Sequence, residues 1–154
     1  MSGRPEDPEE AARLRALRYE LQAFTIDFWH EVDFEGGANA GAWYLDDAVF
    51  ASSVRAYRGR AELDAFYARR RDWTPRVSLH LVGNFRIVPA TPQRVQCRYV
   101  LTLLAADGVP VLPSRAATMV SNVEELVVRQ GDGTWRYASR LVHPVFGNGT
   151  RTRG

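Results

Sequence analysis

The sequence predicts an α+β domain in which helices come first and a run of strands follows. Two observations carry this prediction. Helical apolar patterns dominate the first half of the chain, from residue 9 to the glycine pair 36–37 and again over residues 61–71, whereas residues 77–146 form long β-branched and aromatic segments separated by turns. We therefore expect a cone-shaped domain, with the N-terminal helices packed on the concave face of a strongly bent antiparallel sheet. Such a cone leaves an apolar pocket between the helices and the sheet.

The first helix is expected from Glu9 to the pair Gly36-Gly37. Apolar side chains from Leu14 to Phe28 lie on one stripe that faces a core, and the two glycines end the helix. A shorter helix should follow over residues 38–44.

A short strand is expected over residues 48–52, and residues 57–60 indicate a turn into another helix over residues 61–71. Leu63, Phe66 and Tyr67 lie on one face of that helix, which predicts that this face is buried.

Four longer strands are expected in the second half of the chain, at residues 77–88, 95–104, 116–129 and 135–146. The link Gly131-Asp132-Gly133 is typical of a hairpin turn. The whole then forms a single domain over residues 9–146, between a disordered arm (1–8) and a flexible tail (147–154).

The composition excludes several kinds of chemistry. All 20 basic residues are arginine, so no lysine can serve as a Schiff base, a P-loop residue or a general base. The single cysteine, Cys97, excludes an intrachain disulfide and a multi-cysteine metal site. The three histidines lie too far apart for a metal-binding spacing, so we expect no metal.

Charge and hydropathy favour a soluble cytoplasmic protein. The net charge is only +2, and the arginines are scattered except for a run at residues 69–71, which is typical of a solvated helix end. We therefore expect no nucleic-acid partner. No targeting signal and no membrane-spanning apolar stretch is visible. Arginine without lysine is typical of a genome rich in G and C, which favours a bacterial source.

Asp33, near the end of the first helix, is a candidate for proton-transfer chemistry. It lies about one turn beyond Trp29 and shares the direction of Trp29 and Ile26. A carboxylate among these residues and Tyr19 would be partly desolvated, which raises its pKa, whereas a nearby cation would lower it. The alternative is a solvated acid at a helix end.

His80 is the candidate base. Strict alternation along residues 77–88 places Ser78, His80 and Asn84 on one face, although a bulge at Gly83 would reverse part of this pattern. That face lines either a polar pocket or the solvent, and both readings stay open. An imidazole oriented by the carboxylate of Asp33 would form a minimal general base.

Several other residues are weighed for the same pocket. His30 lies one turn before Asp33, within contact distance on a helix, and is otherwise a packed or surface residue. Trp29 and Asn84 are candidates for substrate binding, and Tyr19 and Tyr99 are candidate hydroxyl donors. His143 is assigned a structural role. Because no nucleophile motif such as G-x-S-x-G is present, the chemistry would be proton abstraction rather than covalent catalysis.

On these residues the chain resembles the nuclear-transport-factor-2-like superfamily, in particular its SnoaL-like branch. That branch includes scytalone dehydratase, a dehydrochlorinase and the small subunit of ring-hydroxylating dioxygenases. The likeness rests on Asp33 with residues 46–50, on residues 57–67, on residues 80–84 and on residues 133–140. The resemblance implies a cystatin-like fold, no cofactor, and a homo-oligomer, either dimer or trimer. It also implies that Asp33 and His80 form a catalytic dyad.

Two departures from the pattern concern the substrate. Scytalone dehydratase has a second pocket histidine on the next strand, and residues 95–104 contain none. Residues 30–37 also differ from the lyase members, which suggests another substrate.

The sequence therefore favours a cofactor-independent lyase or isomerase, similar to a dehydratase or cyclase. Its substrate would be a small, largely apolar metabolite, and a cyclic compound would meet this description. The alternative is a non-catalytic small-molecule-binding or assembly subunit, like the small subunit of a ring-hydroxylating dioxygenase.

Overall fold

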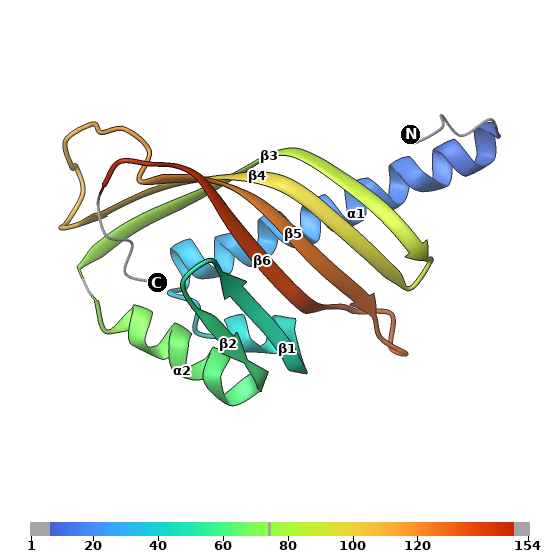
Figure 1. Cartoon of the computed structure of the whole chain (residues 1–154), viewed down its shortest axis with the longest axis horizontal. Coiled ribbons are helices and arrows are strands. Elements are labelled where there is room, and N and C mark those ends of the chain that lie inside the picture. The colour runs from blue at the N-terminus through green and yellow to red at the C-terminus, as the bar shows by residue number, and fades with distance from the viewer. Residues whose placement is uncertain (1–6, 74, 150–154) are drawn as a thin grey trace.

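Two helices pack on a curved six-stranded sheet in the computed structural model, which describes residues 7–73 and 75–149 (Figure 1). The elements are α1 (Pro8–Phe34), the 3-10 helix η1 (Ala40–Trp43), β1 (Tyr44–Ser52), β2 (Ala56–Arg58), α2 (Gly59–Arg71), β3 (Arg76–Thr91), β4 (Arg94–Asp107), β5 (Met119–Arg129) and β6 (Trp135–Gly147). This arrangement confirms the predicted α+β class.

The sheet order is β2-β1-β6-β5-β4-β3, and one pair within it is parallel. β3 to β6 pair as successive antiparallel hairpins, and β1 pairs antiparallel with β2. β1 and β6, however, run parallel, so the expectation of a wholly antiparallel sheet is wrong at this point. The physical reason is that β1 and β6 are far apart in the sequence, so no short turn dictates their relative direction.

α1 begins and ends where its sequence signals predict. The side chain of Asp7 accepts a hydrogen bond from the backbone N–H of Glu9 at 2.9 Å, which caps the first turn. Gly36 and Gly37, at φ 67° and 69°, take the left-handed conformation that ends the helix. Its 27 residues span about 40 Å, and the N-terminal end extends past the sheet in Figure 1.

The segment between α1 and α2 differs from expectation in detail. The predicted helix over residues 38–44 is a single 3-10 turn, and β1 starts at Tyr44, earlier than predicted. The predicted turn at residues 57–60 spans the end of the short strand β2 and the first two residues of α2. There Glu62 accepts a hydrogen bond from the backbone N–H of Arg58 at 2.7 Å and caps α2.

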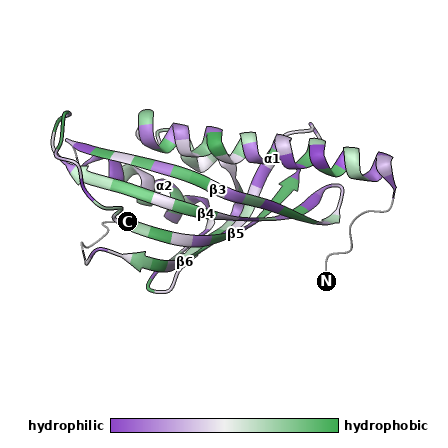
Figure 2. Cartoon of the chain, turned by 90° about the horizontal axis from the view of Figure 1, so that it is seen from above, coloured by the Kyte–Doolittle hydropathy of each residue, from purple (hydrophilic) through white to green (hydrophobic). Residues whose placement is uncertain are grey.

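The core lies between the helices and the sheet. Figure 2 shows hydrophilic and hydrophobic segments interspersed along α1 and along the strands, as expected for elements with one buried side. Leu21 and Phe28 of α1 and Leu63 of α2 are fully buried against strand residues such as Val95 and Val127. No helix in the described ranges is long and apolar enough to cross a membrane.

The ends of the chain fall only partly within the described residues. Pro8 already belongs to α1, and Gly147 to β6. The rest of the predicted arm, residues 1–6, and of the predicted tail, residues 150–154, lie outside the described residues.

Candidate active site

Asp33 and His80 meet at the junction of α1 and β3. The Nδ1 atom of His80 lies 2.6 Å from Oδ1 of Asp33. The backbone N–H of His80 donates to the other carboxylate oxygen at 2.7 Å, and the hydroxyl of Ser78 donates to Oδ1 at 3.0 Å. Both side chains are only 5% exposed. The carboxylate is therefore held by three contacts, all from β3.

A bulge in β3 explains why His80 faces inward. Strand pairing with β4 shifts between Gly83 and Arg86, and Asn84 has a positive φ of 53°. Ser78 and His80 point toward the helices before the bulge, and Phe85 does so after it. Asn84 is exposed and does not share the inward face of His80, so the strict alternation predicted for this strand fails beyond Gly83.

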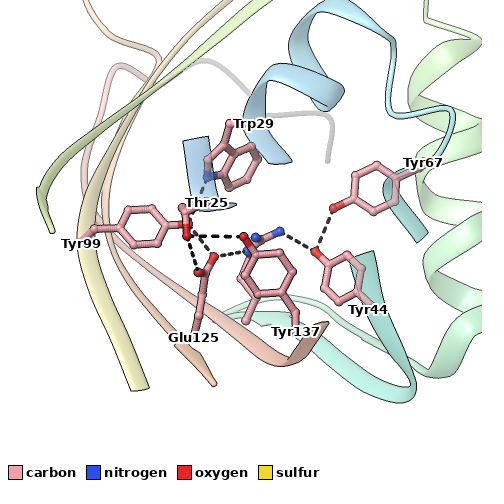
Figure 3. Close-up of polar contacts among 8 residues, drawn as sticks. Thr25, Trp29, Tyr44, Tyr67, Tyr99, Glu125 and Tyr137 are labelled. Carbon is pink, nitrogen blue, oxygen red and sulfur yellow. Dashed lines mark hydrogen bonds and ion pairs between the residues drawn. The ribbon is translucent and has the colours of Figure 1, made fainter. Parts of the chain in front are cut away.

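Trp29 holds the ring of His80 from the helix side. The two rings stack with centroids 4.1 Å apart and an interplanar angle of 15°. The indole N–H of Trp29 donates to the hydroxyl of Tyr99 at 3.1 Å, and that hydroxyl donates to Glu125 at 2.6 Å (Figure 3). Tyr99 is thus a support for Trp29, buried behind it.

His80 also lines an open cavity of about 710 Å³ between the helices and the sheet. Much of its wall is apolar, with Trp29, Phe66 and Leu101 among the lining residues. The rim includes residues 53–55 of the β1–β2 turn and Gly147 at the end of β6. A volume in this range fits a small organic ligand.

His80 is in the neutral form that a general base requires. Burial lowers the pKa of His80 below its usual value of 6.5, and the positive charges of Arg70 and Arg140 lower it further. The hydrogen bond and the negative charge of Asp33 raise this pKa but do not cancel the effect of burial. The ring is therefore neutral at neutral pH. Since the carboxylate of Asp33 faces Nδ1, we assign the proton to Nδ1, which leaves the lone pair on Nε2.

The remaining predicted residues are not brought into this cavity. His30 is exposed, lies against Phe34 and lines a shallower groove of about 270 Å³ together with Asp33. Tyr19 is 77% exposed on the N-terminal half of α1 and does not line the cavity. His143 is exposed, 3.9 Å from Glu124.

The cavity wall contains polar residues that the sequence did not single out as site residues, among them Arg70, Arg76 and Ser121. Arg70 belongs to the arginine run at residues 69–71, for which the sequence predicts a solvated helix end, but it follows Tyr67 by three residues and so shares the buried face of α2. Arg76 precedes His80 by four residues on one strand, which places both on the inward face. These two spacings were the signals available.

A second buried polar cluster lies behind the cavity. Glu125 and Arg140, both 0% exposed, form an ion pair at 2.7 Å. Arg140 also donates to the hydroxyl of Tyr44, which lies 3.0 Å from that of Tyr67 (Figure 3). The guanidinium carbon lies 4.0 Å from the ring centroid of Phe28. This cluster joins β1, β5, β6 and α2 and has a structural role.

No group of three or more histidine, cysteine, aspartate or glutamate residues suited to a metal ion occurs in residues 7–73 and 75–149.

The chain has a cystatin-like fold, the fold named for solved structures that superpose on it. A candidate scytalone dehydratase from Novosphingobium aromaticivorans superposes with a TM-score of 0.77 at 13% identity, over 92% of this chain and 93% of that one. ActVI-ORFA from Streptomyces coelicolor superposes with a TM-score of 0.73 at 19% identity, over 83% of this chain and 97% of that one. An NTF2-like protein with a cystatin-like fold, also from N. aromaticivorans, gives 0.71 at 19% identity, over 95% of each chain.

No protein-family model matches the sequence, and the search of curated proteins finds no match. At these identities the likeness defines the fold, as the sequence resemblance implied, and the chemistry must be argued from the site itself.

Proposed function

We propose that this protein is a cofactor-independent lyase or isomerase in which His80 removes a proton from carbon. The observation that carries the proposal is the contact of 2.6 Å between Asp33 and His80 at the wall of a largely apolar cavity. His80 is neutral there, so its Nε2 lone pair is free to accept a proton at neutral pH.

In the dehydratase form of this reaction, Nε2 of His80 takes the proton from a carbon next to a carbonyl group. The electron pair of that C–H bond forms a C=C bond as the C–O bond to a β-hydroxyl breaks. The imidazolium then returns its proton to the departing oxygen, and water leaves. Asp33 keeps the Nδ1 proton in place and stabilises the imidazolium, so it is a positioning residue.

The comparisons support this choice only as analogy. The named neighbours include a candidate scytalone dehydratase and ActVI-ORFA, and the fold is shared with them. Another neighbour is described as a candidate aromatic ring hydroxylase, so the shared fold does not select one activity. A non-catalytic small-molecule-binding or assembly role is therefore the alternative.

The test uses a reaction that needs only a base in an apolar cavity. In 5-nitrobenzisoxazole a base removes the ring C–H proton as the N–O bond breaks, which gives a coloured nitrophenolate. We expect the protein to accelerate this elimination. His80→Asn should lower kcat/KM by about 10² to 10⁴, the usual contribution of a general base.

Asp33→Asn should lower the rate as well, because the tautomer is no longer held. His143→Asn is the matched control: it removes an exposed histidine that does not line the cavity and should leave the rate unchanged. Equal rates for the wild-type protein and His80→Asn would contradict catalysis by His80 and favour the binding role.

A further inference from the structure

The charged residues of the cavity wall all have the same sign. Arg55, Arg70 and Arg76 line it, and no aspartate or glutamate is among the described lining residues. Arg55 is exposed at the rim, whereas Arg70 and Arg76 are largely buried. A cavity that is otherwise mostly apolar thus carries two partly desolvated guanidinium groups.

The charge of Arg76 is only partly compensated. Its Nη1 atom donates to Asp107 at 3.2 Å, but that carboxylate is 61% exposed and shared with water. Its Nε atom is buried and has no hydrogen-bond partner among the described residues. Leaving such a donor unpaired is unfavourable, so a ligand that offers this N–H an acceptor oxygen would be stabilised here.

Arg70 is in a similar position. It forms no salt bridge with any residue in the described ranges. Burial lowers the pKa of Arg70 and the positive charge of Arg76 adds to this effect, whereas Tyr67 and Asp33 oppose it. Two like charges close enough to disturb each other are stabilised by an anion that binds both.

A neutral donor belongs to the same wall. Ser121 on β5 lines the cavity, and its hydroxyl is buried with no partner within the described residues. It provides a further hydrogen bond for an oxygen-containing ligand.

We propose that the cavity binds an organic anion, a small cyclic or aromatic compound whose carboxylate is held by Arg70 and Arg76. A guanidinium matches the two oxygens of a carboxylate and keeps its charge at any physiological pH. The inference deepens the proposed function, because it names the chemical class of the substrate on which His80 would act.

The test compares two probes of nearly the same shape and different charge, 2-naphthoate and 2-naphthamide, by calorimetric titration. We expect the wild-type protein to bind the acid at least about 10-fold more tightly than the amide. Arg70→Gln and Arg76→Gln should each reduce this preference, and Arg76→Lys should keep part of it.

Arg86→Gln is the matched control, since Arg86 lies on the same strand as Arg76, is exposed and does not line the cavity. It should keep the full preference. Equal affinity for acid and amide, or no saturable binding of the acid at millimolar concentration, would overturn the inference, and so would a preference that survives in both glutamine variants.

Failure of this inference can be told from failure of the proposed function. His80→Asn removes the base and leaves both arginines, so it should abolish the elimination and keep the preference for the acid. A protein that prefers the acid but shows no elimination would be a binding protein for organic acids. One that eliminates but prefers neither probe would be a base catalyst for neutral substrates.

Discussion

The position of one proton decides whether His80 can act as a base. Asp33 receives three hydrogen-bond contacts from β3, so its carboxylate is fixed before any substrate binds. Trp29 stacks on the other side of the imidazole and excludes water from it. The ring is therefore pre-organised in one orientation, as catalysis by proton transfer requires.

The pKa of His80 provides a prediction at this scale. Asp33 raises that pKa against the stronger effect of burial, so Asp33→Asn should lower it further below 6.5. An NMR titration of the His80 ring protons measures the change. Ser78→Ala leaves the carboxylate in place and should have a smaller effect. An upward shift in Asp33→Asn would contradict the assigned balance of burial and charge.

The same pKa shift has a consequence for stability. Because the folded-state pKa lies below that of the unfolded chain, the unfolded state binds more protons as the pH falls through 6.5. Above pH 6.5 the full contribution of neutral His80 to the free energy of unfolding is present. This contribution is lost as the pH falls from 6.5 to the lower pKa of His80 in the folded state. Urea unfolding at two pH values should show the wild-type protein losing stability over this window.

The residues of the dyad could be selected from sequence, but their geometry could not. Spacing alone left Asp33 open to solvent, and alternation put His80 on a face that either lines a pocket or meets water. The choice depends on how β3 packs against α1, over 40 residues away in the chain. A single sequence contains no direct signal for such a contact.

At the scale of the element, the bulge in β3 sets the site. Asn84 in the left-handed region allows the strand to put Ser78 and His80 inward on one side of it and Phe85 inward on the other. Asparagine tolerates this conformation better than most residues. The possible bulge was visible at Gly83 in the sequence, but which residue would take the positive φ was not.

The positive φ of Asn84 predicts that substitutions there change stability through the backbone conformation. Asn84→Val should destabilise the fold by about 1–2 kcal/mol, because a β-branched residue is disfavoured at positive φ. Asn84→Gly should be within about 0.5 kcal/mol of wild type. Arg86→Val, two residues further on at an exposed position, is the control. Urea unfolding measures all three, and a neutral Asn84→Val would contradict the positive φ.

For the whole molecule, the buried pair Glu125 and Arg140 ties the sheet to both helices. Glu125 contacts Thr25 of α1, and Arg140 reaches Tyr44 and thereby Tyr67 of α2. Both charges lie on strands in which alternation would allow a solvent-facing side chain. Glu125 lies on the same face of β5 as the buried Val123 and Val127, whereas Arg140 turns inward after a register shift in the pairing of β5 with β6. The sequence pattern did not reveal that shift.

The pair predicts a large effect on stability. Glu125→Gln or Arg140→Met leaves one buried charge without its partner and should destabilise the protein by about 3–5 kcal/mol. The double variant should lose less than the sum. Glu124→Gln is the control, because Glu124 pairs with Arg98 at the surface and should contribute less than about 1 kcal/mol. Small effects from both single variants in denaturant unfolding would contradict a buried pair.

The most direct measurement is a long-range nitrogen–proton NMR spectrum of His80 at neutral pH, assigned with His80→Asn. We expect a neutral imidazole with its proton on Nδ1, hydrogen-bonded to Asp33, and an unprotonated Nε2 facing the cavity. A doubly protonated ring, or a proton on Nε2, would contradict the central claim, because no lone pair would then be available to accept a proton from a substrate.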